Sequence, residues 1–438
     1  MGYCMRGNLY PSVGLAIILF AAIRGVFIHH LNIPSQIIFK FTAISIVCFG
    51  LFSLFKIEAR QNSQINFVLK SIKINFLFGV IWLVLSLMVS GFSEFGFVYI
   101  FILFPAVTLL VKSSFNLLEI TVSIIGLVTA IGVVEFWWIG KDQGVSQLQA
   151  ITFVVRPVDE GLGRIGENWL PSGYQGFYHD SANVLVMCGL FEISKSIGAK
   201  ISRSVIFRFL LFFGIIFAIF LTGSVANIVI LLFLSLSALL LYGGVYGRIS
   251  VVLAMFFLVS QIEPDENFSD YLYFTQKFKV NQSDLEGNGL FNSLDFESIV
   301  NSMVSIVFGG GHLVNAPLKS TEIAFIKLLI SYGMLPFINL MAICFSPLFL
   351  YFLLIRRLIL DRNLNKTLKD KQRGYHFSKQ IFLRVLPILG ANLTLLHYGS
   401  LFRITSIGIY CVLMALFYKN LFVVFKSLSR TGVDKNQC

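Results

Sequence analysis

Residues 205–243 read VIFRFLLFFGIIFAIFLTGSVANIVILLFLSLSALLLYG. They contain two apolar runs, 205–222 and 224–243, which are separated by Gly223. An α-helix needs roughly 20 apolar residues to cross the hydrocarbon core of a bilayer, which is about 30 Å thick. Two such runs joined by a single glycine predict a hairpin of transmembrane helices.

The whole chain repeats this pattern. Its 438 residues are 56% hydrophobic and 13% charged, whereas a soluble domain is about a quarter charged, and this excludes a soluble globular protein. The other apolar runs are 10–29, 36–55, 74–92, 95–111, 117–138, 180–196, 249–262, 322–355, 380–399 and 404–424. We therefore predict one all-α domain over residues 1–438, a polytopic integral membrane protein with about twelve transmembrane helices. In the long run 322–355, Gly333 and Pro336 predict a kink.

The distribution of basic residues predicts the orientation. If the N-terminus is cytoplasmic, most of the 34 Lys and Arg fall in cytoplasmic segments, above all in the loop 356–379, as the positive-inside rule requires. The C-terminus is then cytoplasmic too. The net charge of +12 lies in these short loops, so we expect no nucleic-acid partner.

Two long segments, 140–180 and 261–321, then lie outside the membrane. The second is rich in acidic residues between Glu263 and Glu297. Loops longer than about 15 residues are uncommon unless they are functional. We therefore expect a site at the outer leaflet, built from these loops and the adjacent outer helix ends.

The first loop carries RPVDEGLGRIG at 156–166. Arg156 and Arg164 are candidates to bind a pyrophosphate, which guanidinium groups hold bidentately, while the glycines let backbone N–H groups approach. An ordinary glycine-rich loop is the alternative. GYQGFYHDSAN at 173–183 follows. His179 and Asp180 at a helix entrance could be a base and its orienting group, or Asp180 could only cap the helix.

The second loop ends in FGGGH at 308–312, and Glu322 follows ten residues later. His312 and Glu322 are further candidate bases, although a solvated loop histidine and a first-turn glutamate are the plainer alternatives. The candidate cations that remain are Arg24, Lys40, Lys319, Lys327 and Arg403. Arg24 and Lys40 fall within spans, where a charge costs about 2.5 kcal/mol or more unless the side chain snorkels to the interface.

Several classes of site are not indicated. The sequence has no GxSxG, HExxH, P-loop or dinucleotide motif. Its six cysteines show no metal-ligand spacing and lie in spans or at the chain ends, which argues against a disulfide framework. We expect neither a metal nor a cofactor. We also find no internal repeat of the kind that marks many secondary transporters.

The order of these pieces resembles the Wzy-type O-antigen and capsule polymerases, whose superfamily includes the O-antigen ligases. The resemblance covers most of the chain. It rests on Gly173–Asn183, on the turn Leu221–Ser224, on Gly309–Gly311 and on Glu322 with Gly333. His397 and Arg403 resemble the polar outer helix end of related sequences. Val225 stands where an arginine often follows the turn, and Glu322 stands where ligases usually carry histidine, which favours a polymerase.

The resemblance implies a protein of the bacterial inner membrane, in which segments 140–180 and 261–321 are periplasmic loops. It implies a metal-independent, inverting glycosyl transfer between undecaprenyl-pyrophosphate-linked oligosaccharides. It implies that Arg156, Arg164 and Arg403 stabilise the leaving pyrophosphate, with Lys319 and His397 as further substrate-binding residues. Glu322, His179 or His312 would act on the acceptor hydroxyl. Other partners would be membrane lipids and a chain-length regulator protein. The alternatives are an O-antigen ligase that transfers the polymer to lipid A core and a transporter of a polysaccharide lipid.

Overall fold

The computed structural model of this chain describes residues 2–31, 110–143, 173–175, 178–197, 202–245, 333–360, 368–394 and 404–433, with single positions at 33–49, 74–81, 107, 199, 247–252 and 329. The described secondary structure is helical, without a strand. Its elements are α1 (Gly2–His29), α5 (Phe115–Gln143), the 3-10 turn η2 (Gly173–Gln175), α7 (Tyr178–Ser196), α8 (Arg203–Thr222), α9 (Val225–Tyr242), α17 (Met334–Leu360), α18 (Leu368–Thr394) and α19 (Ile404–Val433).

Each of these α-helices overlaps a run that the sequence predicts to be a span. Three of the described helices contain segments long and apolar enough to cross a membrane, namely Tyr10–Ile28, Phe115–Trp138 and Arg203–Thr222. Shorter apolar segments occur in α9, α17 and α19. The predicted runs 36–55, 74–92, 95–111 and 249–262 lie largely outside the described residues.

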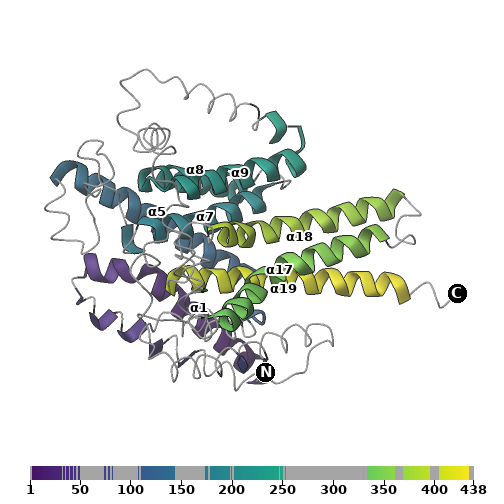
Figure 1. Cartoon of the computed structure of the whole chain (residues 1–438), viewed down its shortest axis with the longest axis horizontal. Coiled ribbons are helices and arrows are strands. Elements are labelled where there is room, and N and C mark those ends of the chain that lie inside the picture. The colour runs from purple at the N-terminus through teal and green to yellow at the C-terminus, as the bar shows by residue number, and fades with distance from the viewer. Residues whose placement is uncertain are drawn as a thin grey trace, which may run out of the picture.

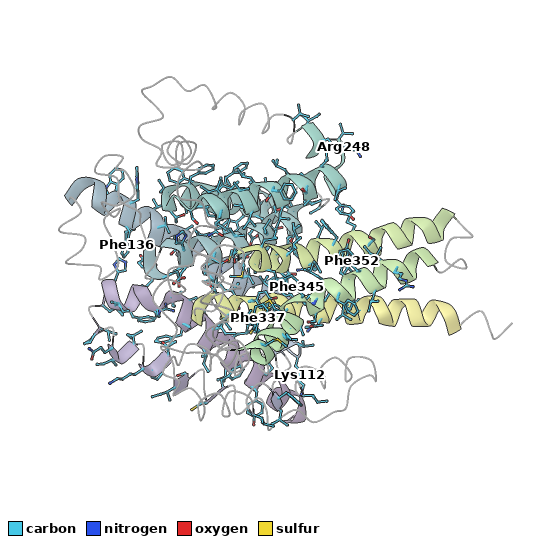
Figure 2. All side chains as sticks on the ribbon, viewed as in Figure 1. Lys112, Phe136, Arg248, Phe337, Phe345 and Phe352 are labelled. Carbon is cyan, nitrogen blue, oxygen red and sulfur yellow. The ribbon has the colours of Figure 1, made fainter. Side chains whose placement is uncertain are left out.

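The exposed faces of the helices are apolar. On α8, Ile206, Leu210, Phe213 and Phe217 are each at least half exposed and follow the helical repeat of three and four residues,. Figure 2 shows a similar face on α17, marked by its exposed Phe352. Soluble monomers rarely expose continuous apolar faces of this size. These faces, with the long apolar helices, indicate an integral membrane protein.

Helix α7 forms the centre of the bundle and contacts α5, α8, α9, α18 and α19. In Figure 1, α8 and α9 lie on one side of α7, and α1 lies on the other side. From His179 to Ile197, Lys195 alone is not fully buried. Because protein surrounds it, α7 can carry polar residues at both of its ends, which explains why its apolar run is short.

Two predicted glycine positions are confirmed as breaks between helices. Gly223 adopts a left-handed conformation (φ 63°) and caps α8, with its N–H donating to Phe220 O at 3.1 Å, as glycine does after a helix. This makes the predicted hairpin of α8 and α9. Gly333 is also left-handed (φ 85°), and α17 begins at the next residue. The predicted kink in run 322–355 is therefore a break at Gly333, and Pro336 lies in the first turn of α17, where a missing N–H costs little.

Candidate functional site

Polar side chains gather at both ends of α7. We call the end at the N-terminus of α7 the His179 end, and the opposite end the Glu192 end. At a rise of 1.5 Å per residue, the stretch of α5 from Glu119 to Glu135 is about 24 Å long, as is the stretch of α7 from His179 to Lys195. Residues 184–191 between the two ends are apolar, apart from Gly189, and buried. The bundle thus has two polar layers, separated by nearly the thickness of a hydrocarbon core.

Tyr174 ties three elements together at the His179 end. Its hydroxyl donates to Glu135 of α5 and lies 2.9 Å from Nε2 of His30, at the end of α1. His30 Nε2 is also 3.3 Å from Glu135 Oε1. The Phe136 ring meets the Tyr174 ring edge to face, with 5.7 Å between their centroids. These contacts fix η2 against α1 and α5.

Glycines make room for Tyr174. A Cβ atom on Gly25 of α1 would lie 2.4 Å from the Tyr174 carbonyl oxygen, and one on Gly132 of α5 would lie 2.5 Å from the Tyr174 ring. Gly173 has a φ of 56°, a backbone conformation that residues other than glycine rarely adopt. Small residues thus allow the Gly173–Gln175 turn to be seated between two helices.

Arg24 is buried in this layer and does not snorkel. Its Nη1 donates to Ala21 O at 3.0 Å and its Nη2 to Gln175 O at 3.3 Å. The Gln175 side chain donates in turn to Ala22 O at 3.0 Å and to Thr129 Oγ1 at 3.2 Å. Two backbone carbonyls therefore accept hydrogen bonds from the charged group that the sequence places within a span. Lys40, the other cation within a span, is exposed.

His179 joins the entrance of α7 to the turn between α8 and α9. Its Nδ1 is 3.1 Å from Ser224 Oγ, and Asn227 Nδ2 donates to the same oxygen at 3.0 Å. The His179 side chain is buried, as is Ser224. The structure thus brings together the two sequence motifs Gly173–Asn183 and Leu221–Ser224. The sequence alone gives the order of these motifs but not their contact.

Asp180 and Asn183 lie one turn apart on α7 and are buried. Because α7 begins at Tyr178, Asp180 is inside the first turn and not at the N-cap, and the helix dipole favours a carboxylate there. Neither side-chain oxygen nor nitrogen of Asn183 has a hydrogen-bond partner among the described residues. A buried amide group without a hydrogen bond costs roughly 1–3 kcal/mol of folding free energy. A further polar group that binds at this face of α7 would therefore be stabilised.

This geometry suits proton transfer. In the tautomer in which Nδ1 donates to Ser224 Oγ, Nε2 of His179 carries the lone pair and can accept a proton. Asn227 fixes Ser224, and Ser224 in turn fixes the plane of the imidazole, as a general base requires. No three His, Cys, Asp or Glu side chains come together as metal ligands in the described part of the chain.

The Glu192 end consists of ion pairs between four helices. Glu119 of α5 accepts from Lys195 of α7 at 2.7 Å and from Arg384 of α18 at 2.8 Å. Glu192 of α7 accepts from Arg208 of α8 at 2.8 Å and from Ser123 of α5. These carboxylates pair with Lys195, Arg208 and Arg384.

Of the predicted site residues, His179 lies within the described residues. The others lie outside them, namely Arg156, Arg164, His312, Lys319, Glu322, His397 and Arg403. Sequence reasoning missed Glu135, Tyr174 and Asn227. The signal for Glu135 and Asn227 was present, because a glutamate or an asparagine inside a predicted span is costly and marks a polar contact. Tyr174 lies outside the predicted spans and carries no such signal.

A scan against models of known protein families and a search of curated proteins both return no match for this chain.

Proposed function

We propose that this protein is a polymerase of the bacterial inner membrane. It joins undecaprenyl-pyrophosphate-linked oligosaccharide repeat units into an O-antigen or capsule-type polysaccharide. The observation that carries the proposal is the His179–Ser224 contact, which unites two of the motifs on which the resemblance to Wzy-type polymerases rests and aligns a candidate base at a helix entrance.

The proposed orientation places the His179 end at the periplasmic side. Basic residues support it, because Lys195, Arg203 and Arg208 lie at the opposite end of the bundle, and cytoplasmic ends collect Lys and Arg. The proposal keeps about twelve spans and cytoplasmic termini. The segments 140–180 and 261–321 are then periplasmic, next to His179.

In the proposed reaction, an acceptor hydroxyl attacks the anomeric carbon of the donor. The bond from that carbon to the pyrophosphate oxygen breaks, and undecaprenyl pyrophosphate leaves with inversion. The hydroxyl proton passes to a base, for which His179 Nε2, Glu322 and His312 are the candidates. The reaction as proposed uses side chains of the chain alone, without a metal or a cofactor.

The negative charge of the leaving group grows in the transition state, so cations at its oxygens accelerate the reaction. We assign this role to Arg156, Arg164 and Arg403, with Lys319 and His397 as further substrate-binding residues. In this scheme the Gly173–Gln175 turn, which the Tyr174 contacts hold in place, has a positioning role. It fixes the chain immediately before α7, and so fixes where His179 enters the layer.

Deletion of the gene in its native bacterium, with the surface polysaccharide resolved by size, tests the proposal. A polymerase mutant retains lipid A core that carries a single repeat unit. Loss of all attached glycan, with lipid-linked polymer accumulating, would instead identify a ligase. An unchanged glycan pattern would contradict both enzymes and favour a transporter.

A further inference from the structure

The Glu192 end contains a cavity of about 370 Å³ between α7, α18 and α19. Its polar lining comprises Ser194, Lys195, Lys379, Gln380, Arg384 and Asn420. We propose that this cavity binds a phosphate group, at the end of the bundle opposite to the proposed catalytic layer.

Arg384 supplies a donor that the described protein atoms leave unused. Its Nη2 donates to Glu119, whereas its Nη1 is buried and has no hydrogen-bond partner among the described residues. The side chain is 14% exposed, and it lines the cavity. A guanidinium group binds two oxygens of a phosphate side by side, so Arg384 can keep Glu119 and still donate to a ligand.

Positive charge is in excess around the cavity. In the described part of the layer, the carboxylates Glu119 and Glu192 face Lys195, Arg208 and Arg384. Lys379 adds a further cation at the cavity, where it donates to Tyr242 O at 3.3 Å. The cations outnumber the carboxylates even when both carboxylates are ionised. Uncompensated charge inside a bundle is costly, and a bound anion would offset it.

The other lining groups suit an oxyanion. Lysine, glutamine, asparagine and serine side chains all offer N–H or O–H donors. The carbonyl groups at the end of α7 disfavour an anion, but Lys195 lies in the last turn and offsets them,. The volume lies within the range of roughly 300–1,000 Å³ that is usual for small-ligand sites.

The depth of the cavity in the bundle agrees with a phosphate at the membrane surface. α18 changes from a polar to an apolar sequence next to Lys379, so the cavity lies where headgroups meet the hydrocarbon core. Basic pockets between helices at this depth bind anionic headgroups. The phosphate could therefore belong to an anionic phospholipid or to a soluble phosphate compound, and the test separates these two sources.

The experiment uses the purified full-length chain in detergent and follows its thermal unfolding. Phosphatidylglycerol, phosphatidylcholine and inorganic phosphate are titrated separately at constant ionic strength. A ligand that binds the folded state raises Tm in a saturable manner. A shift with phosphatidylglycerol alone assigns the site to a lipid headgroup, and a shift with inorganic phosphate as well assigns it to a soluble phosphate. Both results support the proposal.

Two variants locate the binding. Among the described residues, Lys379 makes one long hydrogen bond, to Tyr242 O. The fold should therefore survive Lys379→Gln, and the apparent affinity should fall roughly tenfold. Lys112→Gln makes the same charge change at an exposed turn, away from α18 (Figure 2), and should leave the affinity unchanged.

The proposal is overturned if neither phosphatidylglycerol nor inorganic phosphate gives a saturable shift, or if the two variants weaken binding equally. A shift of equal size with phosphatidylcholine would also overturn it, because the headgroup charge would then be irrelevant. None of these results depends on polymerase activity. Failure of the phosphate-site proposal is therefore distinguishable from failure of the proposed function.

Discussion

His179 and Ser224 are 45 positions apart in the sequence, yet Nδ1 of His179 lies 3.1 Å from Oγ of Ser224. The contact fastens the first turn of the central helix α7 to the hairpin of α8 and α9. It ties the plane of the His179 ring to the turn between α8 and α9, where Gly223 caps α8. The chemistry proposed here depends on this alignment.

Replacing His179 tests the proposed base. His179→Gln keeps a polar side chain of similar size but cannot accept a proton at neutral pH. We expect chain extension to fall by roughly a hundredfold or more, in the range of general acid–base contributions, with the amount of protein in the membrane unchanged. The rate is measured from the length distribution of the polysaccharide. An extension rate within twofold of the native rate would remove His179 from the candidate bases.

Replacing Ser224 tests the alignment. Ser224→Ala removes the oxygen that both His179 and Asn227 contact, so the imidazole loses its orientation but keeps its basicity. We expect a smaller loss of roughly tenfold, about the value of one hydrogen bond. Ser237→Ala is the matched control, because Ser237 lies half-buried on α9, the helix that begins directly after Ser224. Equal losses of chain extension in the two variants would contradict a role of Ser224 in aligning His179.

Replacing Gly25 tests the close packing of α1 against the Gly173–Gln175 turn. Gly25→Ala places a Cβ atom 2.4 Å from the Tyr174 carbonyl oxygen, so α1 and η2 must separate, and we expect a loss of roughly 1–3 kcal/mol seen as a lower Tm. The control is Gly214→Ala on α8, where a Cβ atom meets nothing within 4 Å. Alanine favours a helix by about 1 kcal/mol over glycine, so this variant should be neutral or stabilised. A Gly25→Ala variant with an unchanged Tm would contradict the close packing of Gly25 against Tyr174.

Replacing Glu119 tests the ion-pair layer. Glu119→Gln leaves Lys195 and Arg384 without the carboxylate that they share, and removing one partner of a buried pair costs roughly 3–5 kcal/mol. We expect a marked fall in Tm. The double variant Glu119→Gln with Lys195→Met should recover part of it, because fewer unpaired charges remain. If the two losses simply add, Glu119 and Lys195 are not coupled.

Replacing the first-loop arginines tests the proposed pyrophosphate site. Arg156→Ala and Arg164→Ala should each abolish chain extension, since loss of one donor to a growing negative charge costs roughly a hundredfold or more. Arg248→Ala changes an exposed arginine (Figure 2) and should have no effect. Chains of normal length from either first-loop variant would contradict the assignment.

Hydropathy predicts the helices because lipid contact demands apolar residues over a fixed length. It therefore predicts α8 and α9, with a hairpin at Gly223. The kink predicted in the run 322–355 depends instead on Gly333 and Pro336, and the structure shows α17 beginning directly after Gly333. It does not show that α7 is central, since a helix enclosed by protein has no lipid-facing stripe. The polar residues at its ends, which make its run short, are the trace that this position leaves in the sequence.

The pairs that build the polar layers could not be predicted, because packing between distant segments decides them. Glu119 meets Lys195 from 76 positions away and Arg384 from 265 positions away. What the sequence does contain is the presence of these charges inside predicted spans, which requires partners without naming them. In the same way, the sequence singles out His179 but not Ser224 as its partner.

Reconstitution measures the proposed reaction itself. The purified full-length chain is placed in proteoliposomes with an undecaprenyl-pyrophosphate-linked repeat unit from its native bacterium, and the lipid-linked products are separated by length. We predict a ladder that grows by whole repeat units, with stoichiometric release of undecaprenyl pyrophosphate, and no ladder with His179→Gln. Folded protein that leaves the repeat units unjoined would contradict the polymerase.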